Sequence, residues 1–167
     1  MPIEIVKATA AEIDVVSGIL TEAVIWMQEH GISLWHRQEV TPAAVALDTN
    51  AGHYFLASAV ATPAGTMRLT TADPMFWPEA MPAEAMYLHR LAVRRSFAGR
   101  GVSQAMLAWA VAHAESLGHR CLRLDCDATR PRLRAVYENF GFQYHSNRHM
   151  GHVEVARYEY ATRWHWA

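Results

Sequence analysis

The chain has 167 residues, of which 51% are hydrophobic and 19% are charged, and its formal net charge at pH 7 is -1. This length supports one well-formed core and is short for two, so we expect a single domain covering residues 1–167. The small net charge gives no general reason to expect binding to nucleic acid or to a membrane surface.

No apolar run reaches the ~18 residues that a bilayer span needs, and the N-terminal Met-Pro-Ile-Glu-Ile lacks a basic region and an apolar region. We therefore expect a cytoplasmic protein. The two cysteines, Cys121 and Cys126, lie five positions apart on one predicted strand, so their side chains point to opposite faces and cannot pair. They are predicted to be core thiols in a reducing compartment.

The N-terminal third predicts one strand and two helices. Residues 3–7 alternate apolar and polar side chains, as a half-buried strand does. Thr9-Ala10-Ala11-Glu12 has capping-box form and begins a helical pattern that continues to about Gln28. Thr41-Pro42 supplies an N-cap and first-turn proline for a short helix to about Leu47.

A hairpin and an aromatic loop follow. Residues 53–60 and 66–71 are predicted antiparallel strands, joined by a turn over residues 61–65. Residues 73–83 contain three prolines and no periodicity, which favours a loop. Its aromatic residues, Phe76 and Trp77, either face a substrate or fill a gap in the core, and the sequence leaves both possibilities open.

The central segment has the pattern strand, basic glycine turn, helix. Residues 86–93 predict a strand, and apolar side chains at helical spacing from Val102 to Leu117 predict a helix that stops at Gly118. Gly99 and Gly101 lie just before this helix, where unpaired backbone N–H groups and the helix dipole favour an anion. Fixed positive charge around the turn comes from Arg94, Arg95 and Arg100.

Residues 119–126 predict a buried strand, 131–139 a helix, and 153–163 a long last strand, with an irregular segment between the last two elements. The resulting order, β-α-α-β-β-β-α-β-α-β, indicates an α/β fold with a mixed, mostly antiparallel sheet flanked by helices. The last strand, ending in Trp164-His165-Trp166-Ala167, is a candidate interface for a homodimer.

Leu-x-Val followed by a basic Gly-x-Gly turn and a small-residue helix resembles the acyl-coenzyme A binding motif of the GNAT N-acetyltransferase superfamily. In the best register, Ala98, Gly101 and Ser103 take the three signature positions, and Ala98 replaces the usual long polar residue. The element order agrees, and Leu122 to Cys126 with Leu133 to Phe142 resembles the family's fifth strand and following helix. Arg130-Pro131 stands where many members carry a coenzyme-contacting asparagine.

The resemblance implies acetyl-CoA as cosubstrate, its pyrophosphate on the amides of the turn, and an oxyanion donor near Leu91 to Val93 if the strand bulges. The implied cofactor-binding residues are Leu91, Ala92, Val93, Ala98, Gly99, Arg100, Gly101, Val102 and Ser103. Tyr137 is the candidate general acid, because a phenol keeps its proton at neutral pH, with a buried structural tyrosine as the alternative.

The general base is the weakest part of the pattern. His89 has a suitable pKa range, Glu84 and Asp125 are lesser candidates, and a water chain needs no dedicated base. His145, His149 and His152 lie close together in the sequence but lack the setting of a zinc hydrolase, so we expect no metal.

The predicted function is transfer of acetyl from acetyl-CoA to a primary amine of a small molecule or a protein terminus. The alternative is a non-catalytic acyl-CoA-binding or regulatory module with the same fold. Four aromatic residues hint at an apolar acceptor pocket or simply pack in the core: Trp26, Trp35, Phe76 and Trp77.

Overall fold

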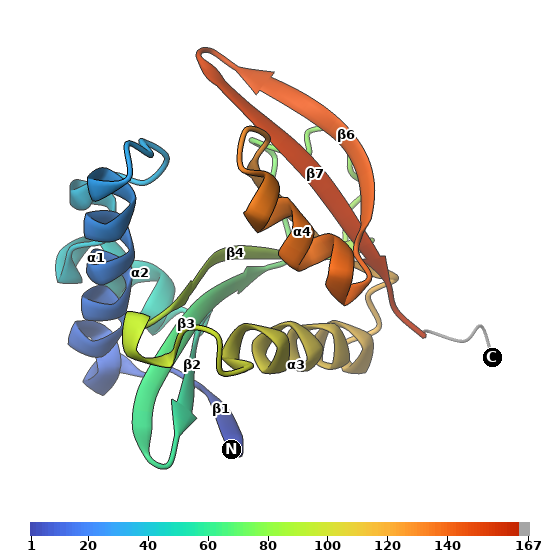
Figure 1. Ribbon diagram of the computed structural model, residues 1–167. Coiled ribbons are helices and arrows are strands. Elements are labelled where there is room, and N and C mark those ends of the chain that lie inside the picture. The colour runs from blue at the N-terminus through green and yellow to red at the C-terminus, as the bar shows by residue number, and fades with distance from the viewer. Residues whose placement is uncertain (164–167) are drawn as a thin grey trace. The chain divides into compact units, whose positions relative to one another are not determined.

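The computed structural model describes residues 1–163. Its helices and strands (Figure 1) are β1 (Ile3–Lys7), α1 (Ile13–Glu29), α2 (Pro42–Asn50), β2 (Tyr54–Ala59), β3 (Thr62–Thr70), β4 (Ala85–Val93), α3 (Val102–Ser116), β5 (Cys121–Asp127), α4 (Pro131–Phe140), β6 (Gln143–Met150) and β7 (Val153–Ala161). The strands hydrogen bond in the order β1-β2-β3-β4-β5-β7-β6. The β4–β5 pair is parallel, and β1–β2, β2–β3, β5–β7 and β6–β7 are antiparallel. This confirms the predicted mixed, mostly antiparallel α/β fold.

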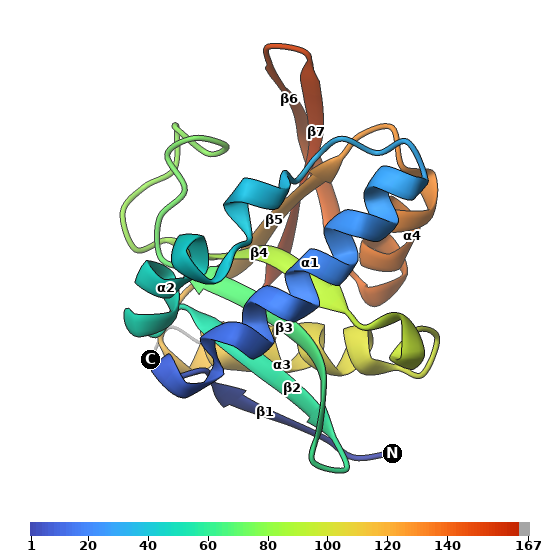
Figure 2. The ribbon, with the colours of Figure 1, turned by 90° about the vertical axis from the view of Figure 1, so that its left-hand side faces the viewer.

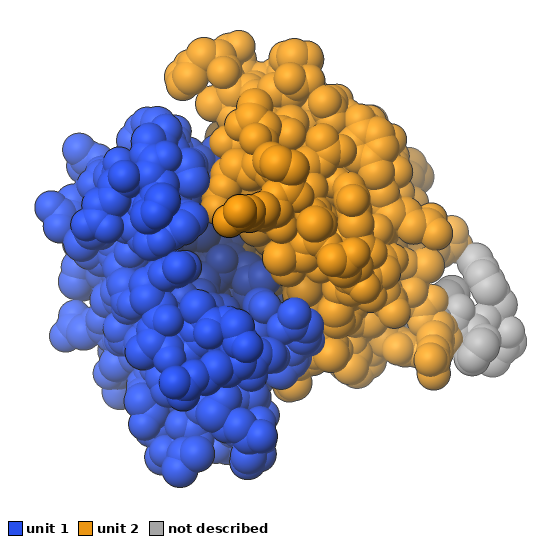
Figure 3. Space-filling model, in the orientation of Figure 1, with its two compact units in different colours: residues 1–69, 90–106 blue, residues 70–89, 107–167 orange. Residues whose placement is uncertain are grey.

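The chain divides into two compact units (Figure 3). The first unit contains Met1–Leu69 and Arg90–Met106, and the second contains Thr70–His89 and Leu107–Ala167. Both β4 and α3 begin in one unit and end in the other. The proposed homodimer interface at Trp164 to Ala167 lies outside the described residues.

In the first unit, α1 packs its apolar side against the strands (Figure 2). The predicted capping box is present, with Thr9 accepting the Ala11 N–H and Glu12 accepting the Thr9 N–H, and it forms a short 3-10 turn before α1. Thr41 caps α2 as predicted, because its hydroxyl accepts the Ala44 N–H at 3.2 Å. The core joins α1, α2 and β2 through buried residues that include Val16, Leu20, Val24, Val45, Tyr54 and Leu56.

The β2–β3 turn was predicted wrongly at residues 61–65. It lies at Val60 and Ala61, whose φ values of +48° and +62° match the tight turns that suit hairpins. Pro63 therefore belongs to β3, opposite Ser58, where a register shift between Ala57 and Ser58 interrupts the ladder. A strand tolerates proline at such an irregularity.

Gly65 also belongs to β3 rather than to the turn. An added Cβ there would lie 2.8 Å from the Ala92 carbonyl oxygen and 2.9 Å from Met106 Sδ. Gly65 thus lets β3 approach β4 and Met106 of α3, which is a packing requirement that a local sequence pattern does not distinguish from a turn signal.

In the second unit, the side chains of β7 alternate between two environments. Tyr158 and Tyr160 lie on the α4 side, where the Tyr137 ring lies 6.3 Å from Tyr158 and the Phe140 ring 5.6 Å from Tyr160. Arg157 hydrogen bonds instead to the loop between β3 and β4, through the Phe76 carbonyl. This loop covers one face of the sheet in the second unit, and α4 covers the other.

The segment predicted as irregular forms β6, which pairs with β7 from Gln143↔Glu159 to Met150↔Val153. The prediction missed this strand because its sequence, QYHSNRHM, is polar on both faces and its residues are exposed or half-buried. Such an edge strand is defined by its hydrogen-bond register against β7 and not by a periodic pattern in its sequence. Cys121 and Cys126 are buried free thiols on β5, as predicted. Within residues 1–163, no helix has the length and apolar character that a membrane crossing requires.

Candidate active site

The glycine turn before α3 has the backbone of an anion site. Gly99 and Gly101 adopt φ values of +72° and +80°, and a Cβ added to either would meet no atom within 4 Å. The Ala105 N–H donates to the Gly101 carbonyl at 3.0 Å. Because helix geometry gives the earlier amides no intrahelical acceptor, those of Val102, Ser103 and Gln104 are oriented toward the turn.

Arg94, predicted as part of the positive charge around this turn, has a structural role. Its Nη1 pairs with a Glu22 carboxylate oxygen at 2.9 Å, and its Nε donates to the Pro63 carbonyl at 3.2 Å. The other Glu22 oxygen accepts the Arg95 N–H at 2.9 Å. Glu22 on α1 therefore fixes the start of the turn and compensates the charge of Arg94.

The other two arginines remain exposed beside the turn. The Arg95 guanidinium lies 4.7 Å from the centre of the Trp26 ring, and that of Arg100 lies 5.9 Å from the Phe97 ring. Both charges stay at the surface, where they attract an anion. The Trp26 ring also stacks on the His30 ring, with 4.2 Å between the ring centres.

The backbone of β4 is irregular at Arg90. It pairs with β5 from Ala85 to Leu88, and Arg90 then adopts a φ of +52° within the strand. A non-glycine residue at positive φ inside a strand marks a local break in the ladder. Leu91 to Val93 lie beyond the part of β4 that pairs with β5.

Tyr137 on α4 is buried, with its ring 6.0 Å from Phe142. Burial raises the pKa of the Tyr137 phenol, and the charges of Cys126 and Asp125 raise it further. The hydroxyl therefore keeps its proton at neutral pH and acts as a hydrogen-bond donor or weak acid.

His89 lies on β4 beside the end of β3. Its Nε2 is 3.1 Å from the hydroxyl of Thr70, and that hydroxyl donates to the Ala72 carbonyl at 3.1 Å. The half-buried ring is thus held by the residues that lead into the loop between β3 and β4.

Asp73, His89 and Asp125 converge from that loop, β4 and β5. Each offers one ligand atom, and these atoms lie within 4.8 Å of one another, which makes them the group within residues 1–163 that could hold a metal ion. Burial and, to a lesser extent, the charge of Asp73 raise the pKa of Asp125 to about 7, although the charge of Arg157 opposes the shift. The two carboxylates therefore form a negative site that favours a proton or a cation.

Glu84, the other candidate carboxylate base, is held in an ion-pair network. Arg123 Nη1 lies 3.3 Å from a Glu84 oxygen and donates to the Tyr87 hydroxyl at 3.2 Å. Arg123 Nε donates to Glu159 at 2.9 Å. Glu84 is thus engaged by a buried guanidinium, and the structure places Asp125 rather than Glu84 with His89.

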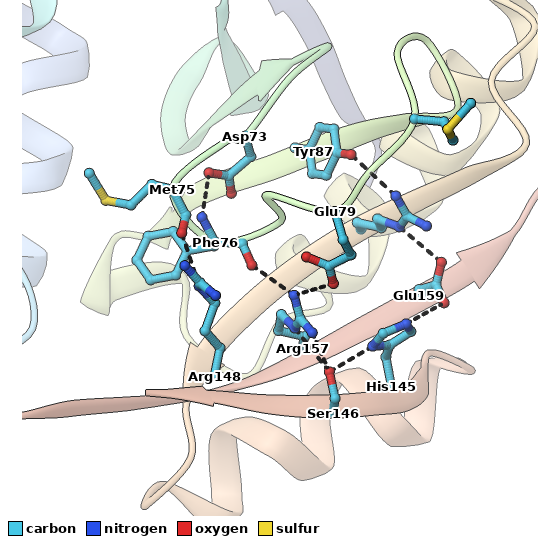
Figure 4. A network of polar contacts seen from close by, with 12 residues as sticks. Asp73, Met75, Phe76, Glu79, Tyr87, His145, Ser146, Arg148, Arg157 and Glu159 are labelled. Carbon is cyan, nitrogen blue, oxygen red and sulfur yellow. Dashed lines mark hydrogen bonds and ion pairs between the residues drawn. The ribbon is translucent and has the colours of Figure 1, made fainter. Parts of the chain in front are cut away.

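The aromatic loop packs against the sheet through Trp77, which is only 2% exposed. The guanidinium carbons of Arg123 and Arg157 each lie 4.6 Å from the centre of the Trp77 ring. Arg157 also donates to the Phe76 carbonyl and pairs with Glu79 at 2.7 Å (Figure 4). Trp77 is therefore a core residue, and the possibility that it faces a substrate is wrong.

Local sequence signals do not mark Asp73 or Thr70 as site residues. Asp73 precedes a proline in a loop, where an aspartate is a common turn residue, and its carboxylate indeed accepts the Phe76 N–H at 3.1 Å. Thr70 is one of several threonines at the end of a strand. Only the pairing of β3, β4 and β5 brings either residue to His89.

Comparison with known proteins identifies the family. The Acetyltransferase (GNAT) family matches residues 19–142. The N-acetyltransferase YesJ of Bacillus subtilis (strain 168), itself uncharacterized, is 28% identical over 137 residues, which cover 77% of this chain and 75% of YesJ.

Two solved structures share the fold. The PaiA N-acetyltransferase from Thermoplasma acidophilum, in complex with coenzyme A, has a TM-score of 0.76 and 17% identity, with 96% of this chain and 100% of that chain covered. YncA from Salmonella typhimurium, solved with its cofactor acetyl-CoA, has a TM-score of 0.75 and 12% identity, with 99% of this chain and 96% of that chain covered. The family match covers most of the chain, and the shared fold and the glycine turn before α3 agree with it. The chain therefore belongs to the GNAT acetyltransferase family.

Proposed function

We propose that this protein transfers the acetyl group of acetyl-CoA directly to a primary amine of a small molecule or a protein terminus. The observation that carries the proposal is the turn at Gly99 and Gly101, where positive φ values and open space leave the first amides of α3 accessible. PaiA was solved with coenzyme A and YncA with acetyl-CoA. Because both proteins share this fold, they support acetyl-CoA as the cosubstrate.

The pyrophosphate of the coenzyme binds to the amides of Gly99 to Ser103, and the exposed guanidinium groups of Arg95 and Arg100 add positive charge. Ala98 contributes no side-chain hydrogen bond, so backbone amides supply most of the specific contacts. A backbone N–H between Leu91 and Val93 donates to the thioester oxygen as negative charge develops there, in the part of β4 beyond Arg90 and its positive φ.

Tyr137 protonates the leaving thiolate. A thiolate with a conjugate-acid pKa of about 8.5 leaves poorly unless a hydrogen bond or a proton stabilises it as the carbon–sulfur bond breaks. The raised pKa of the Tyr137 phenol keeps the proton in place until that charge forms.

His89 accepts the proton that the amine must lose before or during its attack. A histidine imidazole can take up a proton near physiological pH, and one carboxylate oxygen each of Asp73 and Asp125 lies within 4.8 Å of a ring nitrogen of His89. The same negative charge attracts an amine that arrives as an ammonium ion, which supports an amine as the acceptor class.

The test is release of free thiol from acetyl-CoA in the presence of a panel of amines that includes polyamines, amino sugars, amino acids and peptides with free N-termini. We expect thiol release to depend on one class of amine and the acetylated product to be detected by mass spectrometry. Coenzyme A binding without thiol release for any amine would contradict catalysis and favour the acyl-CoA-binding module.

A further inference from the structure

Arg90 on β4 is a half-buried cation, and no carboxylate pairs with it within residues 1–163. The arginines of β3, β5 and β7 do have such partners: Arg68 pairs with Asp48, Arg123 with Glu84 and Glu159, and Arg157 with Glu79. Moving a charge out of water without a partner of opposite sign costs free energy. A bound anion would therefore supply the partner that Arg90 lacks.

Two contacts hold the Arg90 guanidinium against the segment between α1 and α2. Its Nη1 donates to the Glu39 carbonyl at 3.3 Å, and its central carbon lies 5.9 Å from the centre of the Trp35 ring. A guanidinium has five N–H donors, and the bond to Glu39 uses one of them. The others form a planar fork that matches the two oxygens of a carboxylate.

The backbone of Arg90 places this cation next to the proposed oxyanion donor. Its φ of +52° is unfavourable for a residue with a Cβ, and such conformations gather at functional sites. Leu91 to Val93, which follow directly on β4, contain the N–H proposed to bind the thioester oxygen. The acceptor amine must reach the carbon bonded to that oxygen. The other groups of a short acceptor therefore lie within reach of the Arg90 side chain.

Resting on the proposed function, we propose that Arg90 binds a carboxylate of the acceptor, so that the acceptor is a small amine that also carries a carboxylate, such as an amino acid. The guanidinium donates to both carboxylate oxygens while the Trp35 ring and the Glu39 carbonyl hold it in place. A polyamine or an amino sugar offers no such group, and a protein N-terminus has a neutral amide at the corresponding position. This inference selects one class from the amines of the proposed function.

The kinetic test compares the amino acid that the amine panel identifies with its carboxamide, which lacks only the negative charge. Arg90→Asn removes the guanidinium, and asparagine tolerates a positive φ better than most residues. We expect kcat/KM to fall about tenfold or more for the amino acid, mainly through KM, and less than about twofold for the carboxamide. Because each acceptor is compared with itself in the two enzymes, the different basicity of the two amines cancels.

Arg37→Asn is the matched control, because it removes the same charge from an exposed residue of the segment between α1 and α2. It should leave kcat/KM unchanged for both acceptors. An equal loss in Arg37→Asn and Arg90→Asn would indicate a general attraction of anions and would overturn direct binding by Arg90.

NMR provides a second readout that needs no catalysis. The Nε–H signal of Arg90, assigned by its loss in Arg90→Asn, is followed while N-acetylglycine or N-acetylglycinamide is added to the wild type with coenzyme A. We expect N-acetylglycine to shift this signal and N-acetylglycinamide to leave it unchanged. This titration uses the wild type, so it stands even if Arg90→Asn folds poorly.

Three further results would overturn the inference: a preferred acceptor without a carboxylate, equal losses for the amino acid and its carboxamide in Arg90→Asn, or weaker coenzyme A binding by that variant. The last result would make Arg90 a contact of the coenzyme. If no amine releases thiol, the proposed function fails, whereas the NMR titration still decides whether Arg90 binds a carboxylate.

Discussion

Asp125→Asn should stabilise the folded protein while impairing its activity. The pKa of Asp125 is raised to about 7 in the folded protein, against about 3.9 for an aspartate in an unfolded chain. Between these values the folded state holds a proton that the unfolded state lacks, so the free energy of unfolding decreases as the pH rises from about 4 to about 7. Above pH ~7 the full cost of the buried charge is present.

A difference of three pKa units corresponds to about 4 kcal/mol, which is an upper limit because Asp125 is not fully buried. An asparagine removes this cost, so the variant should exceed the wild type in free energy of unfolding by about 2 to 4 kcal/mol at pH 8 and by little at pH 4. Urea unfolding, followed by circular dichroism at several pH values, measures the difference.

Asp127→Asn is the matched control on the same strand, since its side chain accepts the Thr129 N–H at 2.9 Å and an amide oxygen can do the same. It should not stabilise the protein. If the difference in free energy of unfolding between Asp125→Asn and the wild type did not change with pH, the electrostatic reasoning would be refuted. Destabilisation by Asp125→Asn at pH 8 would instead indicate a bound cation.

Tyr137→Phe removes only the hydroxyl and should lower kcat by about 10² to 10⁴ with little change in coenzyme A affinity; a loss below about threefold would show that the hydroxyl is dispensable. Gly101→Val should weaken coenzyme A binding more than tenfold, about 1.4 kcal/mol, in calorimetry. Gly151→Val, at a similar φ of +63° and with equally open space, controls for backbone strain and should bind normally. Trp77→Ala should lower the free energy of unfolding by about 3 to 5 kcal/mol in urea, because the indole is buried, and a loss below about 1 kcal/mol would contradict its core role.

Local sequence patterns determined most elements of the fold, because their signals act over a few residues. The Thr9 capping box, the Thr41 N-cap and the Gly99 to Gly101 turn each satisfy nearby backbone groups, and each appears in the structure as predicted. The buried strand that contains Cys121 and Cys126 was recognisable for the same reason.

Contacts between segments far apart in the sequence decided the features that local patterns left open or predicted wrongly. β6 is a strand because β7 supplies its partners, Gly65 lies in β3 because β4 and α3 approach it closely, and Arg94 is neutralised by Glu22, 72 positions away. Likewise, Thr70, Asp73, His89 and Asp125 meet only because separate strands bring their ends together. The charge and pKa of such a group depend on distances across the sheet, and those distances are set by folding rather than by neighbours in the sequence.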